Sequence, residues 1–184
     1  MTAQELIKKY GVMLETKYIP GKGYVPTGRI YVRSGGYAKK MGDFDEILSR
    51  KPEIMGILIE EMEEKERKYQ ERQDKINAIP GLAEIQAAKQ DLDRWNEEWE
   101  RSFDDVGGLG VRPKPEYDFA AMNAKYPRAA AYLKAESYSH AAHDVKASAG
   151  QDALEKIING EDYEEALKVM EDEWSAYCDA HVWD

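Results

Sequence analysis

INAIPGLAEIQAAKQDLDRWNEEWERSF, residues 76–103, is the stretch that decides the fold. Ile79-Pro80-Gly81 predicts a tight reversal of the chain, because proline and glycine interrupt a helix. Apolar side chains then recur at three- or four-residue steps, as on one face of a helix: Leu82, Ile85, Ala88, Leu92, Trp95, Trp99 and Phe103. A similar stripe precedes the turn. Residues 53–105 are therefore predicted to form two long antiparallel helices, a helical hairpin with both tryptophans buried in its seam.

The first 52 residues predict a small head that contains β-structure. Thr2 and Glu5 form the pattern of a capping box, so a short helix is expected between them and Gly11, which ends it. Residues 12–19 and 29–33 then alternate apolar and polar side chains, as strands do. We expect these segments to pair as a β-hairpin with one apolar and one basic face.

A segment rich in glycine and proline, residues 106–116, predicts a linker. Residues 117–184 then predict helices that begin at Asp118, Pro127, Asp152 and Asp162, with Gly150 ending the second of them. The chain is therefore predicted to be α+β and mostly helical. It would consist of an N-terminal head of helix and β-hairpin (residues 1–52), a central antiparallel helical hairpin and a C-terminal helical bundle.

The composition excludes several classes of protein. The 184 residues include one cysteine, which excludes an internal disulfide framework and fits a reducing cytosol. No apolar run approaches the roughly 18 residues of a membrane span, and the first ten residues lack the pattern of a secretory signal. With 42% hydrophobic and 34% charged residues, the chain has enough apolar material for a core. We expect a cytoplasmic protein that does not enter a membrane.

The net charge of −10 is distributed unevenly along the chain. Residues 1–52 hold ten basic and five acidic side chains, whereas residues 53–105 hold eight basic and sixteen acidic ones. Because basic side chains pair with phosphates and aromatic rings stack on bases, the head is a candidate for binding DNA or RNA. An ordinary exposed hairpin face is the alternative. The residues predicted to bind nucleic acid are Lys17, Lys22, Arg29, Arg33, Lys39 and Lys40, interleaved with Tyr18, Tyr24, Tyr31 and Tyr37.

The acidic helices of residues 53–105 predict a different surface. Carboxylates at helical spacing can imitate the phosphates of a nucleic acid and occupy a basic channel of a partner protein. Basic residues among them can instead form ion pairs within the helix, which leaves an ordinary solvated face as the alternative; these are Lys65, Arg67, Lys68 and Arg72. The predicted partner-binding residues are Glu60, Glu61, Glu63, Glu64, Glu97 and Glu98.

No motif in the chain indicates a particular enzymatic reaction. The glycine-rich segments at residues 20–23 and 107–110 do not complete a phosphate-binding loop, and no nucleophile signature accompanies a histidine. We therefore predict a non-enzymatic protein with no catalytic residue and no cofactor.

One set of residues has the chemistry of a zinc site. His140 and His143 form one pair and Cys178 and His181 another, each three residues apart on a predicted helix. Two such pairs on facing helices would supply the four ligands of a tetrahedral site. The alternative places Cys178 and His181 in the core and the other histidines at the surface.

Residues 132–181, YLKAESYSHAAHDVKASAGQDALEKIINGEDYEEALKVMEDEWSAYCDAH, resemble small accessory proteins carried by phages and integrative elements of gut Firmicutes. In size and acidity the whole chain also resembles anti-CRISPR proteins that inhibit the RNA-guided nuclease of type II systems. This resemblance implies a host-defence antagonist in a bacterial cell, which binds the CRISPR effector nuclease with its guide RNA and blocks DNA binding or cleavage. A DNA- or RNA-binding accessory protein of a mobile element is one alternative, and a zinc-containing helical module is another.

Overall fold

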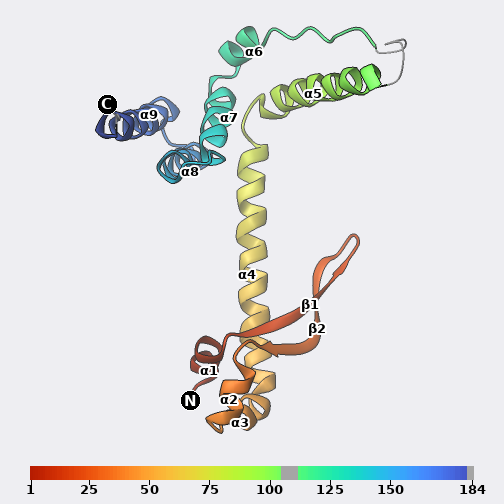
Figure 1. Cartoon of the computed structure of the whole chain (residues 1–184), viewed down its shortest axis with the longest axis vertical. Helices are drawn as coiled ribbons and strands as arrows, with labels where there is room; N and C mark the ends of the chain where they lie inside the picture. The colour runs from red at the N-terminus through yellow and green to blue at the C-terminus, as the bar shows by residue number, and fades with distance from the viewer. Residues whose placement is uncertain (105–111, 182–184) are drawn as a thin grey trace. The chain divides into compact units, whose positions relative to one another are not determined.

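The computed structural model describes residues 1–104 and 112–181, apart from the side chains of Phe103 and Asp104. The chain forms two compact units, Met1–Glu71 and Arg72–Asp184, and the division falls inside a long helix (Figure 1). The fold is mostly helical with a two-stranded antiparallel hairpin near the N-terminus, as predicted. Residues 106–111 of the predicted linker, including the glycine-rich segment 107–110, lie outside the described residues. Among the described helices, none is long and apolar enough to cross a membrane.

The first unit begins as the sequence predicts. In helix α1 (Ala3–Tyr10), the Thr2 side chain accepts a hydrogen bond from the backbone N–H of Glu5, and the Glu5 carboxylate accepts one from the Thr2 N–H at 2.7 Å. Gly11 ends α1 with a φ of 61°, a left-handed conformation that favours glycine. The elements that follow are β1 (Val12–Ile19), β2 (Gly23–Val32), α2 (Gly35–Lys40), α3 (Phe44–Ser49) and α4 (Lys51–Asn77).

The hairpin pairs its strands from Val12 opposite Val32 out to the turn at residues 20–22. The second strand is longer than predicted, since it includes Pro26. Proline is tolerated on edge strands, and both strands of a two-stranded sheet are edges. The register shifts between Leu14, which lies opposite Ile30, and Thr16, which lies opposite Pro26, and this irregularity separates the base of the hairpin from its tip.

The hairpin and the helices around it share one core. Leu6 and Tyr10 of α1, Ile47 of α3 and Ile54 of α4 are completely buried. The other buried members are Ala3, Val12 and Ala38, and the partly buried side chains packed on them include Ile30 and Val32 of the hairpin. This packing explains why a two-stranded hairpin, which is marginal by itself, is stable here.

The second unit is helical. It contains the last turn of α4, then α5 (Leu82–Asp104), α6 (Phe119–Lys125), α7 (Pro127–Ser139), α8 (Asp144–Ile158) and α9 (Tyr163–Ala180). Helices α7, α8 and α9 pack on one another as the predicted C-terminal bundle. Its core includes Ile85 of α5, Tyr132 of α7, Ile157 of α8 and Met170 of α9. As predicted, Asp162 caps α9, because its side chain accepts hydrogen bonds from the backbone at the start of that helix.

Two predictions about α7 and α8 are wrong. Helix α8 continues through Gly150, where the sequence predicted a helix end. A Cβ at this position would lie 2.3 Å from the backbone nitrogen of Ser139, so glycine is needed for the close approach of α7 and α8. Helix α7 ends at Ser139, so His140 and His143 lie in the connection between the two helices.

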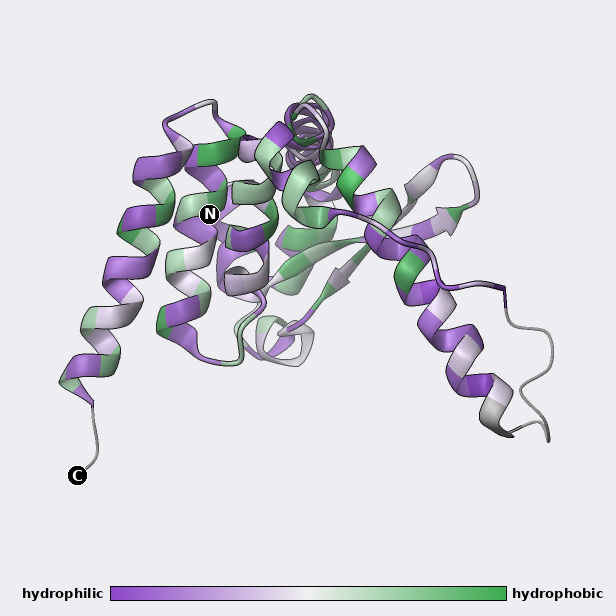
Figure 2. Ribbon diagram, turned by 90° about the horizontal axis from the view of Figure 1, so that it is seen from above, coloured by the Kyte–Doolittle hydropathy of each residue, from purple (hydrophilic) through white to green (hydrophobic). Residues whose placement is uncertain are grey.

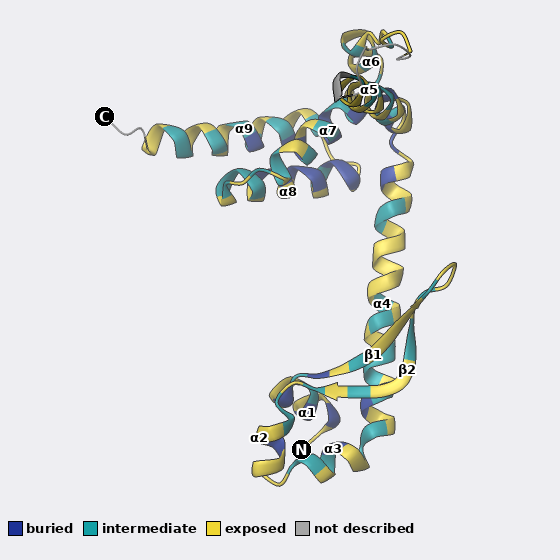
Figure 3. Ribbon diagram, turned by 45° about the vertical axis from the view of Figure 1, so that its right-hand side comes forward, coloured by how far each residue is buried: buried dark blue, intermediate teal, exposed yellow. Residues whose placement is uncertain are grey.

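The two long helices predicted for residues 53–105 are present, with a turn at residues 78–81 between them. Residues of α4 up to Glu71 belong to the first unit, whereas α5 packs on α6 and α7 in the second. Residues 65–71 of α4, which lead up to the division, are polar apart from Tyr69 and are all exposed (Figure 3).

Candidate functional site

The six cations predicted to bind nucleic acid all lie in the first unit, and all six are exposed. In β2 and just after it, exposed Arg29, Tyr31 and Arg33 alternate with half-buried Ile30 and Val32. This alternation turns the basic side chains of the hairpin away from the core. Lys17 lies in β1, Lys22 in the turn, and Lys39 and Lys40 in the last turn of α2.

None of these six cations forms an ion pair with a described residue. Other cations of the same unit are paired: Lys9 lies 3.1 Å from Asp43, and Arg50 lies 3.1 Å from Glu53. Lys39 lies 5.0 Å from the centre of the Phe44 ring, a cation–π contact that leaves its charge uncompensated. A phosphate would therefore displace no existing salt bridge from these six side chains.

Exposed tyrosines accompany the free cations. Tyr18, Tyr24, Tyr31 and Tyr37 are 61%, 69%, 58% and 52% exposed. Tyr18 and Tyr24 are direct partners across the hairpin, and their rings meet edge to face with centroids 5.4 Å apart. Exposed aromatic rings on a basic surface are platforms on which nucleic-acid bases stack.

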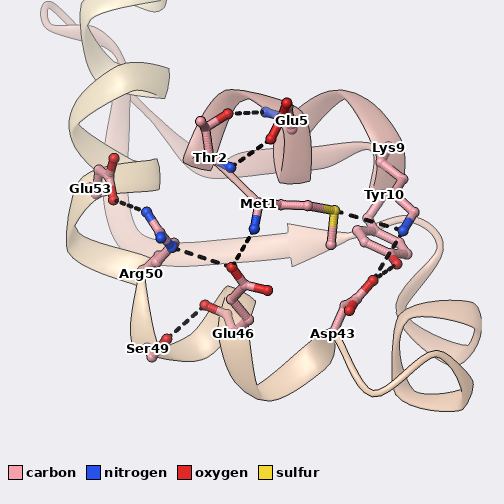
Figure 4. Close-up of polar contacts among 10 residues, drawn as sticks. All are labelled: Met1, Thr2, Glu5, Lys9, Tyr10, Asp43, Glu46, Ser49, Arg50 and Glu53. Carbon is pink, nitrogen blue, oxygen red and sulfur yellow. Dashed lines mark hydrogen bonds and ion pairs between the residues drawn. The ribbon is translucent and has the colours of Figure 1, made fainter.

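A brace of three polar side chains stabilises the head (Figure 4). The Tyr10 hydroxyl donates a hydrogen bond to the Asp43 carboxylate, and the Lys9 ammonium donates to the same oxygen at 3.1 Å. The contact with Tyr10, and then that with Lys9, hold the pKa of Asp43 below its usual range. Asp43 directly precedes α3, but its side chain makes no capping hydrogen bond to that helix. The carboxylate instead ties α1 to the segment between α2 and α3.

The six predicted partner-binding carboxylates divide into free and paired groups. Glu60, Glu61 and Glu63 are exposed on α4 and have no ion-pair partner among the described residues. The other three are paired: Glu64 with Arg67 at 2.6 Å and Lys68 at 3.1 Å, Glu97 with Arg101 at 3.0 Å, and Glu98 with Arg112 at 3.2 Å. Ion pairing within the helix, the alternative that the sequence offered, therefore applies to Glu64 and Glu97 and leaves the free negative charge at residues 60–63.

A groove of about 990 Å³ lies within the first unit, between the hairpin and α4. The residues that line it on the hairpin include Leu14, Thr16, Lys22 and Tyr24, and those on α4 include Leu58, Glu61, Met62, Lys65, Glu66 and Tyr69. No sequence pattern indicated this groove, because its two walls come from separate segments that meet only in the folded unit.

The prediction that both tryptophans lie buried in a helical seam is wrong. Trp99 is 42% exposed, Trp95 is half-buried, and their rings stack with centroids 5.4 Å apart. The C-terminal half of α5, which contains both tryptophans, is mostly hydrophilic (Figure 2). Trp95 contacts Arg112: its Nε1 donates a hydrogen bond to the Arg112 carbonyl at 2.8 Å, while the Arg112 guanidinium pairs with Asp91 at 2.8 Å. This ion pair, and then a hydrogen bond from Tyr117, lower the pKa of Asp91.

The four candidate zinc ligands do not converge. The described residues contain no group of three or more histidine, cysteine, aspartate or glutamate side chains placed to hold a metal ion. His143 instead contacts Tyr177, with its Nε2 3.0 Å from the hydroxyl oxygen. His181 stacks on the same tyrosine with ring centroids 4.1 Å apart. Cys178 is half-buried, while His140 and His181 are exposed, so the prediction of a core position for His181 is wrong.

Comparison with known proteins gives no family for this chain, since no protein-family model, curated protein or solved structure matches it. Its function is therefore argued from the residues themselves.

Proposed function

We propose that the first unit binds nucleic acid through its basic hairpin and α2. The observation that carries this proposal is a set of six exposed cations that have no acidic partner among residues 1–104 and 112–181, beside four exposed tyrosines, in a chain whose net charge is −10. Phosphates would pair with the cations and bases would stack on the rings. Because such contacts carry little sequence information, binding would tolerate many sequences.

The salt dependence of binding tests this proposal quantitatively. Each neutralised phosphate releases counterions, so the logarithm of the binding constant falls with the logarithm of salt by about 0.9 per contact for a duplex and about 0.7 for a single strand. If all six cations pair with phosphates, a slope of about −5 for a duplex and about −4 for a single strand follows. The measurement is fluorescence anisotropy of labelled duplex and single-stranded oligonucleotides at several salt concentrations.

A matched pair of variants separates specific contacts from overall charge. Replacement of Arg29, Arg33, Lys39 and Lys40 by alanine should weaken binding to every oligonucleotide and reduce the slope by about 3 to 4. The control replaces four cations that are already paired, Arg67, Lys68, Arg101 and Lys134, and changes the net charge equally. Absence of any complex with the wild-type protein at low salt, or equal losses in the two variants, would remove the proposal.

A second candidate function is antagonism of a guide-RNA-loaded CRISPR nuclease. The observation that favours it is the free carboxylate group of Glu60, Glu61 and Glu63 in the same unit as the basic head. A guided nuclease offers both a positively charged channel and nucleic acid, so both surfaces have a counterpart there. Its experiment is cleavage of a target duplex across inhibitor ratios.

A binder should saturate near a stoichiometric ratio, without progressing with incubation time. Replacement of Glu60, Glu61 and Glu63 by lysine should then slow association and weaken its salt dependence, because exposed charges affect steering more than folding. Full cleavage at large molar excess, with effectors from several bacteria, would exclude this candidate and leave nucleic-acid binding alone.

A further inference from the structure

The groove between the hairpin and α4 shares Lys22 and Tyr24 with the basic surface of the first unit, but its α4 wall carries mostly apolar and acidic side chains. On α4, Leu58 and Met62 are half-buried and Tyr69 is 58% exposed, and all three line the groove. They continue the stripe that begins with completely buried Ile54. Residues 58–69 cover about three helical turns, or roughly 17 Å at 1.5 Å per residue. The apolar surface of α4 therefore extends from the core as far as Met62, and Tyr69 adds an aromatic ring beyond the polar residues Lys65 and Glu66.

The lining residues are adaptable as well as apolar. Met13 and Met62 both line the groove, and methionine fits irregular partner surfaces because its side chain is unbranched and polarizable. Tyr24 and Tyr69 line the groove as well, and both are exposed. Aromatic side chains and methionine are enriched at the centres of protein interfaces.

The charge of the groove distinguishes between partners. Glu61, Glu63 and Glu66 line it without an ion-pair partner among the described residues, and they outnumber the lining cations Lys22 and Lys65. Carboxylates along the wall repel the phosphates of a nucleic acid, whereas they attract lysine and arginine side chains. The groove thus combines an apolar floor with a negative margin.

We propose that this groove receives a basic amphipathic helix of a partner protein. Such a helix would place its apolar side chains against Leu58, Met62 and Tyr69 and its basic side chains beside Glu61 and Glu66, the helix-in-groove mode of recognition. The groove shares Lys22 and Tyr24 with the nucleic-acid surface, but none of its α4 residues belongs to that surface, and the proposal does not depend on nucleic-acid binding.

The probe is a fluorescein-labelled 14-residue peptide of leucine and lysine, arranged with one apolar helical face, and the full-length protein is titrated into it. A peptide of the same composition in an order without an apolar face, and a leucine–glutamate peptide, serve as comparisons. The wild type is expected to bind the amphipathic basic peptide at least tenfold more tightly than either comparison, and the peptide should gain helical circular dichroism on binding.

Two variants and one control locate the binding. Met62→Asp makes the groove more negative but less apolar. If the peptide docks on the apolar surface, its affinity should fall at least tenfold, whereas simple charge attraction would raise it. Glu66→Lys should weaken binding at least fivefold more than Glu60→Lys, an equal charge change on the opposite face of α4. Tighter binding by Met62→Asp, or equal effects of Glu66→Lys and Glu60→Lys, would overturn the proposal.

Discussion

Replacement of Gly150 by alanine should destabilise the second unit, although alanine is the better helix former. Gly150 is buried in α8, and an added Cβ would lie 2.3 Å from the backbone nitrogen of Ser139 and 2.7 Å from the backbone carbon of Tyr138. Ordinary contacts of this kind measure 3.4–4 Å. Because both atoms belong to the backbone, α7 and α8 must separate by about 1 Å to relieve the overlap.

The expected magnitude is the difference between two opposing effects. Alanine stabilises a helix interior by about 1 kcal/mol relative to glycine. Overpacking that forces a backbone shift costs about 1–3 kcal/mol, and an overlap with two backbone atoms belongs at the upper end. The net loss should be about 2 kcal/mol. Gly56 in α4 is the matched control, because nothing lies within 4 Å of its added Cβ; Gly56→Ala should gain about 0.5–1 kcal/mol.

Tryptophan fluorescence during denaturant unfolding measures this effect in the right unit. All four tryptophans, residues 95, 99, 174 and 183, belong to the second unit. Gly150→Ala should lower the midpoint of the fluorescence transition, whereas Gly56→Ala should change it little and raise the stability seen by circular dichroism. An unchanged or raised fluorescence midpoint for Gly150→Ala would refute the close approach of α7 and α8.

Three further predictions follow from the same structure. The pKa of Asp43 is lowered by its contact with Tyr10 and then by that with Lys9. Its contribution to the free energy of unfolding is therefore present above the unfolded-state pKa of about 3.9 and is lost as the pH falls through the lower folded-state pKa. Asp43→Asn should make the free energy of unfolding of the first unit less dependent on pH in this acidic range. Gly81→Ala should cost about 1–3 kcal/mol, measured by tryptophan fluorescence, because φ is 76° and the added Cβ would lie 2.0 Å from the Tyr126 ring. A chelator should leave the melting temperature unchanged, and elemental analysis should find no zinc; a drop of several degrees would restore the zinc module as a candidate.

The elements that could be predicted are those whose ends depend on local chemistry. Helix α1 lies between the capping box of Thr2 and the left-handed Gly11, and α9 begins after the cap Asp162. Each of these capping interactions joins residues only a few positions apart, so it can be recognised from the local sequence alone. The exposure of the basic side chains on the hairpin could be predicted for a similar reason, since alternation along a strand decides which side chains face the core.

The features that could not be predicted depend on segments distant in the chain. Gly150 looks like a helix end, and only the neighbouring backbone of α7 shows that it permits close packing. The stripe that includes Trp95 resembles one half of a seam between helices, but Trp95 donates a hydrogen bond to Arg112, a residue of the predicted linker. Two further features also depend on which side chains the folded first unit brings together. One is the absence of ion pairs at the six basic residues, as far as the structure is described, and the other is the groove beside α4.

The ion pairs of α4 decide which of its carboxylates can act on a partner. Glu64 is held by Arg67 at 2.6 Å and by Lys68 at 3.1 Å, so its charge is compensated locally and contributes little at a distance. Glu60, Glu61 and Glu63 have no such partner among the described residues, so their negative charge remains uncompensated. Replacing Glu64 by alanine would remove the partner of Lys68, while Arg67 would keep its ion pair with Glu71 at 2.6 Å. Counting carboxylates along α4 would therefore place the negative surface wrongly. The uncompensated negative charge lies on the turns of α4 nearest the core of the first unit.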